Sequence, residues 1–161
     1  MEEKKVCIVV TDENGQEREL ELSKLMSVKK YIRSGEVYLV YNTCLEDDVE
    51  VIYVKEQFGE IFLKIAEAYG VVVLANKRDT LWVQVLGRTS GVTHTVFFYL
   101  DDVDAVTFEN GHVEVGVRYY KFAQHAVLKV NKDMLSFSAD FARALGCGSE
   151  SEVQNDQREG N

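Results

Sequence analysis

The segment Thr80–Leu100 has the pattern of a β-hairpin with two apolar faces, although a hairpin packed on one side needs only one. With the loop centred on residues 88–93, the pairs of one face form an ordinary core: Val85–Val96, Val83–Phe98 and Leu81–Leu100. The pairs of the other face mix aromatic and polar side chains: Trp82–Tyr99, Gln84–Phe97 and Leu86–Thr95, with Arg88 at the tip. Either a helix such as 56–69 covers this second face, or the face is exposed to solvent and binds planar groups. The polar side chains favour the second interpretation, because each would need a buried partner under a helix.

The rest of the chain predicts further hairpins and a few helices. Asn-Gly pairs at 14–15 and 110–111 are strong hairpin signals. The second predicts the pairs Val106–Val115 and Phe108–Val113. The segments with the apolar spacing of helices are Lys24–Arg33, Glu56–Tyr69 and Asp133–Leu145. Residues 119–130 are expected to form a strand or irregular segment followed by a turn of helix.

This pattern indicates an α+β fold, an antiparallel sheet built of consecutive hairpins with about three helices packed on it. Residues 1–147 are expected to form a single domain, and the polar, acidic segment 148–161 a disordered tail. The similarity between Leu45-Glu-Asp-Asp-Val and Leu100-Asp-Asp-Val is too short to indicate a repeat.

Composition narrows the class of protein. The 161 residues are 46% hydrophobic, which fits a globular chain, and no run approaches the roughly 18 apolar residues of a membrane helix. The cysteines Cys7, Cys44 and Cys147 are too widely spaced for a disulfide framework or a zinc site, so a reduced, cytoplasmic setting is expected. The formal net charge of −9 argues against nucleic acid, but the charge is segregated. Residues 23–34 contain no acid and four bases: Lys24, Lys29, Lys30 and Arg33.

No catalytic or cofactor motif is evident. The acidic residues near 46–48 and 101–104 could hold Mg²⁺, but aspartates are common in turns. Asp104 and Glu114-Val-Gly116 resemble the metal-binding core of PD-(D/E)xK nucleases. Gly116 replaces the expected lysine, and the predicted pairing puts Asp104 and Glu114 on opposite faces, so such a protein would be degenerate. We therefore expect no enzyme activity, no metal and no cofactor.

Four stretches together resemble the ThermoDBP family of archaeal single-stranded DNA-binding proteins. They are residues 24–42, 78–89, 97–103 and 111–122, with the sequences KLMSVKKYIRSGEVYLVYN, RDTLWVQVLGRT, FFYLDDV and GHVEVGVRYYKF. The resemblance implies an archaeal, thermophilic source and a mixed α/β domain with an exposed apolar cleft edged by basic residues. It also implies sequence-independent binding of single strands, a role in DNA replication and repair, and frequent oligomerisation.

The leading prediction is a protein that binds and protects single-stranded DNA, or alternatively RNA. The residues expected to stack on bases are Trp82, Phe97 and Tyr99, with Tyr120 extending the strip, and Gln84 is expected to contact base edges. The residues expected to meet phosphates are Arg78, Arg88, Arg118, Lys121, Lys29, Lys30 and Arg33. The alternatives are a protein–protein interaction or oligomerisation domain that uses the same aromatic face, and the degenerate nuclease. We expect a homo-oligomer without a membrane partner.

Overall fold

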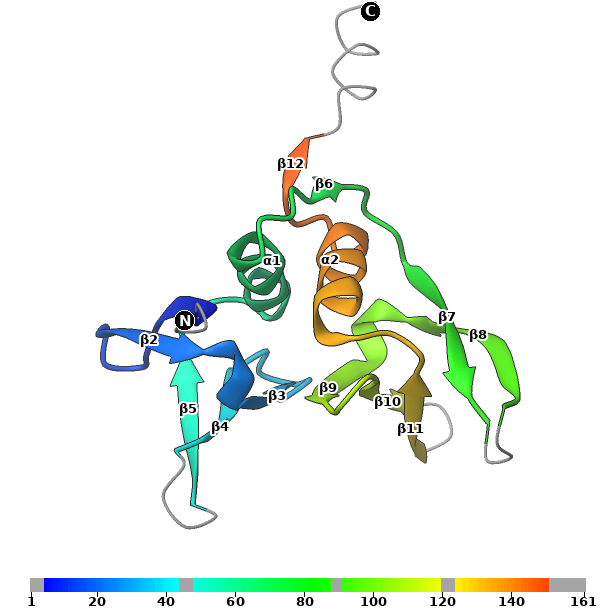
Figure 1. Ribbon diagram of the computed structural model, residues 1–161, viewed down its shortest axis with the longest axis horizontal. Helices are drawn as coiled ribbons and strands as arrows, with labels where there is room; N and C mark the ends of the chain where they lie inside the picture. Colours follow the sequence, from blue (N-terminus) through cyan, green and yellow to red (C-terminus); the bar gives the residue numbers. More distant parts are fainter. Residues whose placement is uncertain (1–4, 44–47, 88–90, 120–123, 151–161) are drawn as a thin grey trace, which may run out of the picture.

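The computed structural model describes residues 5–43, 48–87, 91–119 and 124–150. Its main layer is an eight-stranded antiparallel sheet with the strand order β5-β4-β3-β9-β10-β11-β7-β8. The strands are β3 (Leu25–Lys30), β4 (Val37–Asn42), β5 (Val49–Val54), β7 (Thr80–Leu86), β8 (Thr93–Tyr99), β9 (Val103–Phe108), β10 (Val113–Tyr119) and β11 (Gln124–Val130). The helices α1 (Phe58–Ala68) and α2 (Met134–Ala144) lie side by side over the middle of this sheet (Figure 1).

Two small sheets complete the described part. The strands β1 (Cys7–Thr11) and β2 (Glu17–Glu21) form an antiparallel hairpin, and β6 (Leu74–Ala75) pairs in parallel with β12 (Ser149–Glu150). Short 3-10 turns, η1 (Leu22–Lys24) and η2 (Leu100–Asp102), follow β2 and β8. Ser149 and Glu150 belong to the segment predicted to be a disordered tail, and that prediction is wrong for these two residues because they pair with β6. Residues 151–161 lie outside the described residues.

The chain contains the same structural unit twice. The first half runs β1-β2-η1-β3-β4-β5-α1, and the second repeats this order as β7-β8-η2-β9-β10-β11-α2. At the junction β3 pairs with β9, and Val28 lies opposite Val106. These two valines are equivalent, since each stands three residues after the start of its strand, Leu25 or Val103. An approximate two-fold axis therefore passes through this pair, and Figure 1 shows the β1–β2 and β7–β8 hairpins at opposite ends of the molecule.

Backbone hydrogen bonds repeat in the same way. The amide of Lys55 donates to the carbonyl of Thr11, and in the second half Asn131 donates to Gln84. Asp12 bridges to Val54 in the first half, as Val85 pairs with Val130 in the second. The helix ends also correspond: Gly70 and Gly146 each follow their helix at φ 83°, a conformation that favours glycine. The β1–β2 hairpin is thus joined to β5, and the β7–β8 hairpin is joined to β11 in the same way.

The core lies between the sheet and the helices. The fully buried positions of the central strands include Val28, Leu39, Val103, Val106, Val113, Val115 and Val117. The two helices meet through phenylalanines, and the Phe62 and Phe141 rings pack edge to face with centroids 4.8 Å apart. One continuous cluster of buried side chains includes residues from both halves. The helix-facing side of the sheet is therefore its buried side, and the opposite side is called the outer face below.

The predicted helix Lys24–Arg33 is wrong, since this segment forms η1, β3 and a turn. Val28 is fully buried between Leu39 and Val106, and β3 pairs with β4 on one side and β9 on the other. Pairing on both edges satisfies the backbone of a central strand and overrides a weak helical spacing. The described residues thus contain two α-helices, whose positions agree with the other two predicted helices. The predicted turn of helix before residue 130 is also wrong, because β11 continues to Val130.

The hairpin pairs Val106–Val115 and Phe108–Val113 are confirmed, whereas the register of β7 and β8 is not the predicted one. Val83, not Val85, lies opposite Val96, because the six residues between the strands are 87–92 and not 88–93, and the Gly87 amide donates a hydrogen bond to the Val92 carbonyl. The register differs by two residues, and side chains alternate with a period of two, so each one keeps its predicted face.

Candidate nucleic-acid interface

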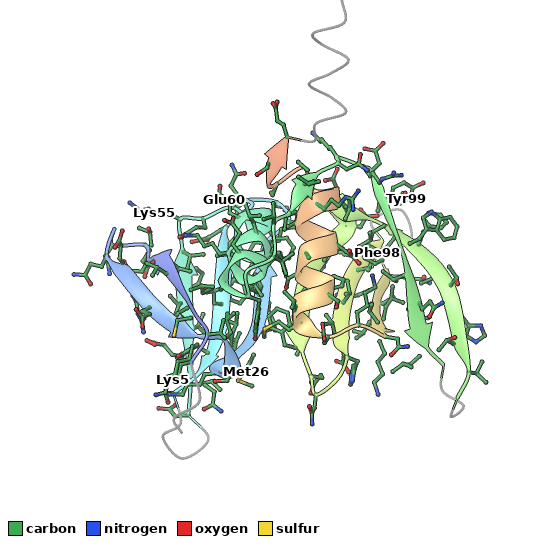
Figure 2. The ribbon with its side chains drawn as sticks, turned by 45° about the horizontal axis from the view of Figure 1, so that its top comes forward. Lys5, Met26, Lys55, Glu60, Phe98 and Tyr99 are labelled. Atoms are coloured by element: carbon green, nitrogen blue, oxygen red, sulfur yellow. The ribbon has the colours of Figure 1, made fainter. Side chains whose placement is uncertain are left out.

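The outer side of the β7–β8 hairpin carries three neighbouring exposed aromatic side chains, which we call the aromatic platform: Trp82, Phe97 and Tyr99. Their exposed fractions are 63%, 44% and 52%, whereas Phe98, the neighbour of Tyr99 on β8, is 1% exposed. Phe98 and Tyr99 are labelled in Figure 2. Trp82 lies opposite Phe97, with ring centroids 5.0 Å apart, and Phe97 is 5.8 Å from Tyr99. The alternative that a helix covers this face is therefore wrong, because both described helices lie on the other side of the sheet.

The aromatic platform is not a requirement of the fold. In the repeated unit, the positions equivalent to Trp82 and Phe97 are Val9 and Glu19, which also lie opposite each other. The position equivalent to Tyr99 is Glu21, whose carboxylate is paired with Lys5 and Lys24. The same unit thus folds with a valine and two acids where the second half exposes three aromatic rings. This internal comparison indicates that the rings serve a purpose other than stability.

Gln84 extends the aromatic platform toward the loop. Its side chain is exposed and lies opposite that of Thr95, which is also exposed. Its backbone carbonyl is used by Asn131, but no hydrogen bond of its side-chain amide is found among the described residues. The amide is therefore positioned to hydrogen-bond with a polar edge of a molecule stacked on the rings.

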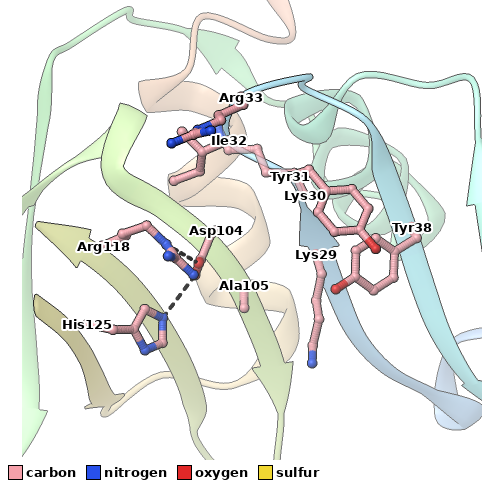
Figure 3. A pocket seen from close by; sticks show the side chains of 10 residues that line it. All are labelled: Lys29, Lys30, Tyr31, Ile32, Arg33, Tyr38, Asp104, Ala105, Arg118 and His125. Carbon is pink, nitrogen blue, oxygen red and sulfur yellow. Dashed lines mark hydrogen bonds and ion pairs between the residues drawn. The ribbon is translucent and has the colours of Figure 1, made fainter. Parts of the chain in front are cut away.

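A second feature of the outer face is a pocket of about 530 Å³ near the junction of the two halves, which we call the central pocket (Figure 3). It lies where β3 meets β9, and Lys29 there stands opposite Ala105. The lining residues are Lys29, Lys30, Tyr31, Ile32, Arg33, Tyr38, Asp104, Ala105, Arg118 and His125. Four of them are lysine or arginine and one is an acid, so the pocket is locally basic within a chain of net charge −9.

Asp104 holds two of the basic side chains in place. One carboxylate oxygen lies 3.3 Å from Nε of Arg118, and the other lies 3.2 Å from Nε2 of His125 (Figure 3). Gly116 leaves room for the contact between Asp104 and His125, because a Cβ at this position would approach the Asp104 carboxylate to 2.9 Å and the His125 ring to 3.1 Å. Arg118 is still half exposed and can reach a ligand. Lys29 and Arg33 have no ion pair among the described residues.

A β-bulge explains how Asp104 reaches the pocket. Gly116 pairs with Ala105 but Val117 pairs with Val103, so Asp104 is the extra residue on β9. The bulge turns Asp104 to the outer face, the side on which Glu114 also lies. The prediction that these two acids occupy opposite faces is therefore wrong. Even so, no group of three or more His, Cys, Asp or Glu with a metal-binding arrangement occurs in the described ranges.

A tyrosine cluster that was not predicted from the sequence borders the central pocket. The Tyr38 ring lies between Tyr31 and Tyr53, with centroid distances of 5.1 Å and 5.5 Å. The hydroxyl oxygens of Tyr31 and Tyr53 are 3.3 Å apart, and this hydrogen bond is the main cause that raises the pKa of Tyr53 to about 12. The alternation of Tyr38 and Tyr53 with buried aliphatic neighbours was the available signal for this cluster. These rings form a second aromatic patch on the outer face, on β4 and β5 of the first half.

The remaining predicted phosphate contacts are divided. The Lys30 ammonium lies 4.9 Å from the centre of the Phe58 ring, on the helix side of β3, and burial lowers its pKa. It is therefore the least available cation of the central pocket. Arg78 lies beside α2 in a separate hollow lined by Leu81 and Arg143, so the structure does not bring it to the aromatic platform. Arg88, Tyr120 and Lys121 lie outside the described residues.

No family model, no curated protein and no solved structure matches this chain. The resemblance to the ThermoDBP family therefore stays a prediction. Neither described helix is long and apolar enough to cross a membrane.

Proposed function

We propose that this protein binds single-stranded nucleic acid, DNA or RNA, on the outer face of its sheet. The observation that carries the proposal is the exposure of Trp82, Phe97 and Tyr99 at positions where the other half of the same chain has a valine and two acids. Rings that add little to folding and remain in water are suited to stack with the bases of an unpaired strand.

The aromatic platform would supply most of the affinity. Stacking of a base on an aromatic side chain contributes about 1–3 kcal/mol and does not depend on the identity of the base. Trp82 and Phe97 are inclined at 42° to each other, so each ring can accept a different base. The Gln84 amide would add a hydrogen bond to a base edge without making the site specific for one sequence.

The central pocket would receive the phosphates. Lys29, Arg33 and Arg118 present positive charge there, and the ring of Tyr31 is 46% exposed at its rim. The strands from β8 to β3 are spaced about 4.8 Å apart, so roughly 24 Å of sheet separates the two features if the sheet is treated as flat. A strand of several nucleotides would be needed to reach both, and affinity should rise with oligonucleotide length until both are occupied.

The test is a fluorescence anisotropy titration of labelled oligo(dT) and oligo(U) with the wild type and the double variant Trp82→Ala, Phe97→Ala. The matched control is Val9→Ala with Glu19→Ala, which changes the equivalent positions of the first half. The proposal expects the platform variant to lose affinity and the control to keep it. Equal affinity of a folded platform variant and the wild type would contradict the proposal.

A further inference from the structure

The strand β8 is the last strand at one end of the eight-stranded sheet, and its outer edge is free among the described residues. The Gly87 amide donates to the Val92 carbonyl, and the Leu100 amide donates to the Asp79 carbonyl. The even-numbered residues of β8 therefore point their backbone N–H and C=O groups toward β7. In an antiparallel ladder the alternate residues point the other way. The residues with outward N–H and C=O groups are therefore Thr93, Thr95, Phe97 and Tyr99.

The equivalent edge of the first half is protected, and that of β8 is not. The outward residues of β2 that correspond to Thr95, Phe97 and Tyr99 are the acids at positions 17, 19 and 21. Charged side chains on an edge strand are a common means of preventing pairing with another chain. The segment Thr93–Tyr99 contains no Asp, Glu, Lys, Arg or Pro and is rich in residues that favour strands. The same unit has thus kept a blocked edge in one copy and an open edge in the other.

We propose that the β8 edge pairs with the β8 edge of a second copy of this chain and joins two sheets across a two-fold axis. The strand is self-complementary when the axis passes midway between Val96 of one copy and Val96 of the other. Thr95 then lies opposite Phe97 of the second copy, and Thr93 lies opposite Tyr99. All four outward-facing residues gain backbone partners, and the side-chain pairs are aromatic against β-branched, a favourable combination. A charged partner strand would find no opposite charge on this edge, whereas a second copy matches it in both shape and charge, which favours a second copy as the occupant.

Such pairing would place the outer faces of both copies on the same side, because the two-fold axis is perpendicular to the joined sheet. Phe97 of each copy would lie diagonally across from Phe97 of the other, and the Tyr99 side chains would lie at the two ends of the paired edge. The dimer would present one continuous aromatic surface about twice as large as that of a single chain. The pairing itself does not depend on the proposed nucleic-acid function.

The experiment is sedimentation velocity of the full chain in the micromolar range, with Thr95→Lys as the edge variant and Glu17→Lys as the matched control at the equivalent position of β2. We expect a dimeric wild type, a dimeric control and an edge variant whose dimer dissociation constant is raised by at least about tenfold, because two lysines then enter the paired edge. Thr93→Lys repeats the test at the other end of the same edge and keeps it valid if Thr95→Lys does not fold.

A monomeric wild type would overturn the inference, as would an edge variant that dimerises like the wild type, or a control that dissociates to the same extent. Oligonucleotide binding separates this inference from the proposed function. A monomeric wild type that binds oligo(dT) would refute the dimer alone, and a dimer without affinity for oligo(dT) or oligo(U) would refute the binding function alone.

Discussion

Replacing Asp104 by asparagine should make the protein bind single strands more tightly. The carboxylate of Asp104 is the one acid among the lining residues of the central pocket, and it neutralises Arg118 and interacts with His125. Asparagine has the same shape and keeps an oxygen that can accept a hydrogen bond, but it removes the negative charge. A bound phosphate would then meet Arg118 without the opposing carboxylate.

The magnitude follows from Coulomb's law. Two unit charges about 4 Å apart in water interact with about 1 kcal/mol, and removing that repulsion between Asp104 and a phosphate corresponds to roughly fivefold tighter binding. Stability should change little, because an ion pair with a half-exposed partner such as Arg118 contributes about 0–1 kcal/mol.

The assay is an anisotropy titration with oligo(dT) at several salt concentrations. The control is Glu13→Gln in the β1–β2 turn, an exposed position that changes the net charge equally but lies on the far hairpin. The Asp104→Asn variant should bind more tightly than this control, and the slope of log K against log[salt] should steepen by about 0.7 if Arg118 gains one phosphate contact. Unchanged or weaker binding would refute the assignment of phosphates to the central pocket.

Three further predictions test the structure. Absorbance titration should show one tyrosine ionising near pH 12, and Tyr31→Phe should lower the pKa of Tyr53 because the hydrogen bond between the hydroxyls is lost. Arg18 donates two hydrogen bonds to Glu50 (2.7 and 3.1 Å) and lowers the pKa of the Glu50 carboxyl. This ion pair stabilises the fold by about 1 kcal/mol or less. The stabilisation is present above the usual glutamate pKa and is lost as the pH falls through the lowered pKa of Glu50. Arg18→Gln should therefore flatten the acid limb of a denaturation series. Phe62→Ala should cost about 3–5 kcal/mol in urea unfolding, because Phe62 is fully buried between the helices, and a loss below 1 kcal/mol would contradict this packing.

The sequence predicted those parts of the fold whose signals are local. Asn-Gly turns and helical spacing located two of the hairpins, α1 and α2. The predicted faces of Trp82 and Tyr99 are correct although the predicted register is not, because a shift of two residues leaves each side chain on the same face of the sheet. The helix predicted for Lys24–Arg33 is wrong because pairing on both edges decides the conformation of this segment: β4 follows it directly, but β9 is distant in the sequence.

The duplication was hidden because the two halves share a pattern of buried positions more than residue types. Glu21-Leu22-Ser-Lys-Leu25 corresponds to Tyr99-Leu100-Asp-Asp-Val103, where only one residue is the same, whereas the more similar segment beginning at Leu45 is not the equivalent one. The β-bulge at Asp104 could not be predicted either, because a regular alternation of side chains does not indicate where an extra residue is inserted. The central pocket needs β3, β4, β9, β10 and β11 together, so it could not be derived from any single stretch of sequence.

The most direct test of the central claim uses the intrinsic fluorescence of Trp82, the single tryptophan of the chain. Because Trp82 is 63% exposed on the aromatic platform, stacking of a base on its indole should quench the emission and move it to shorter wavelength as oligo(dT) or oligo(U) is added. The expected result is saturable quenching with the same dissociation constant as the anisotropy titration. Oligonucleotide binding that leaves the Trp82 emission unchanged, or no binding at all, would contradict the proposal.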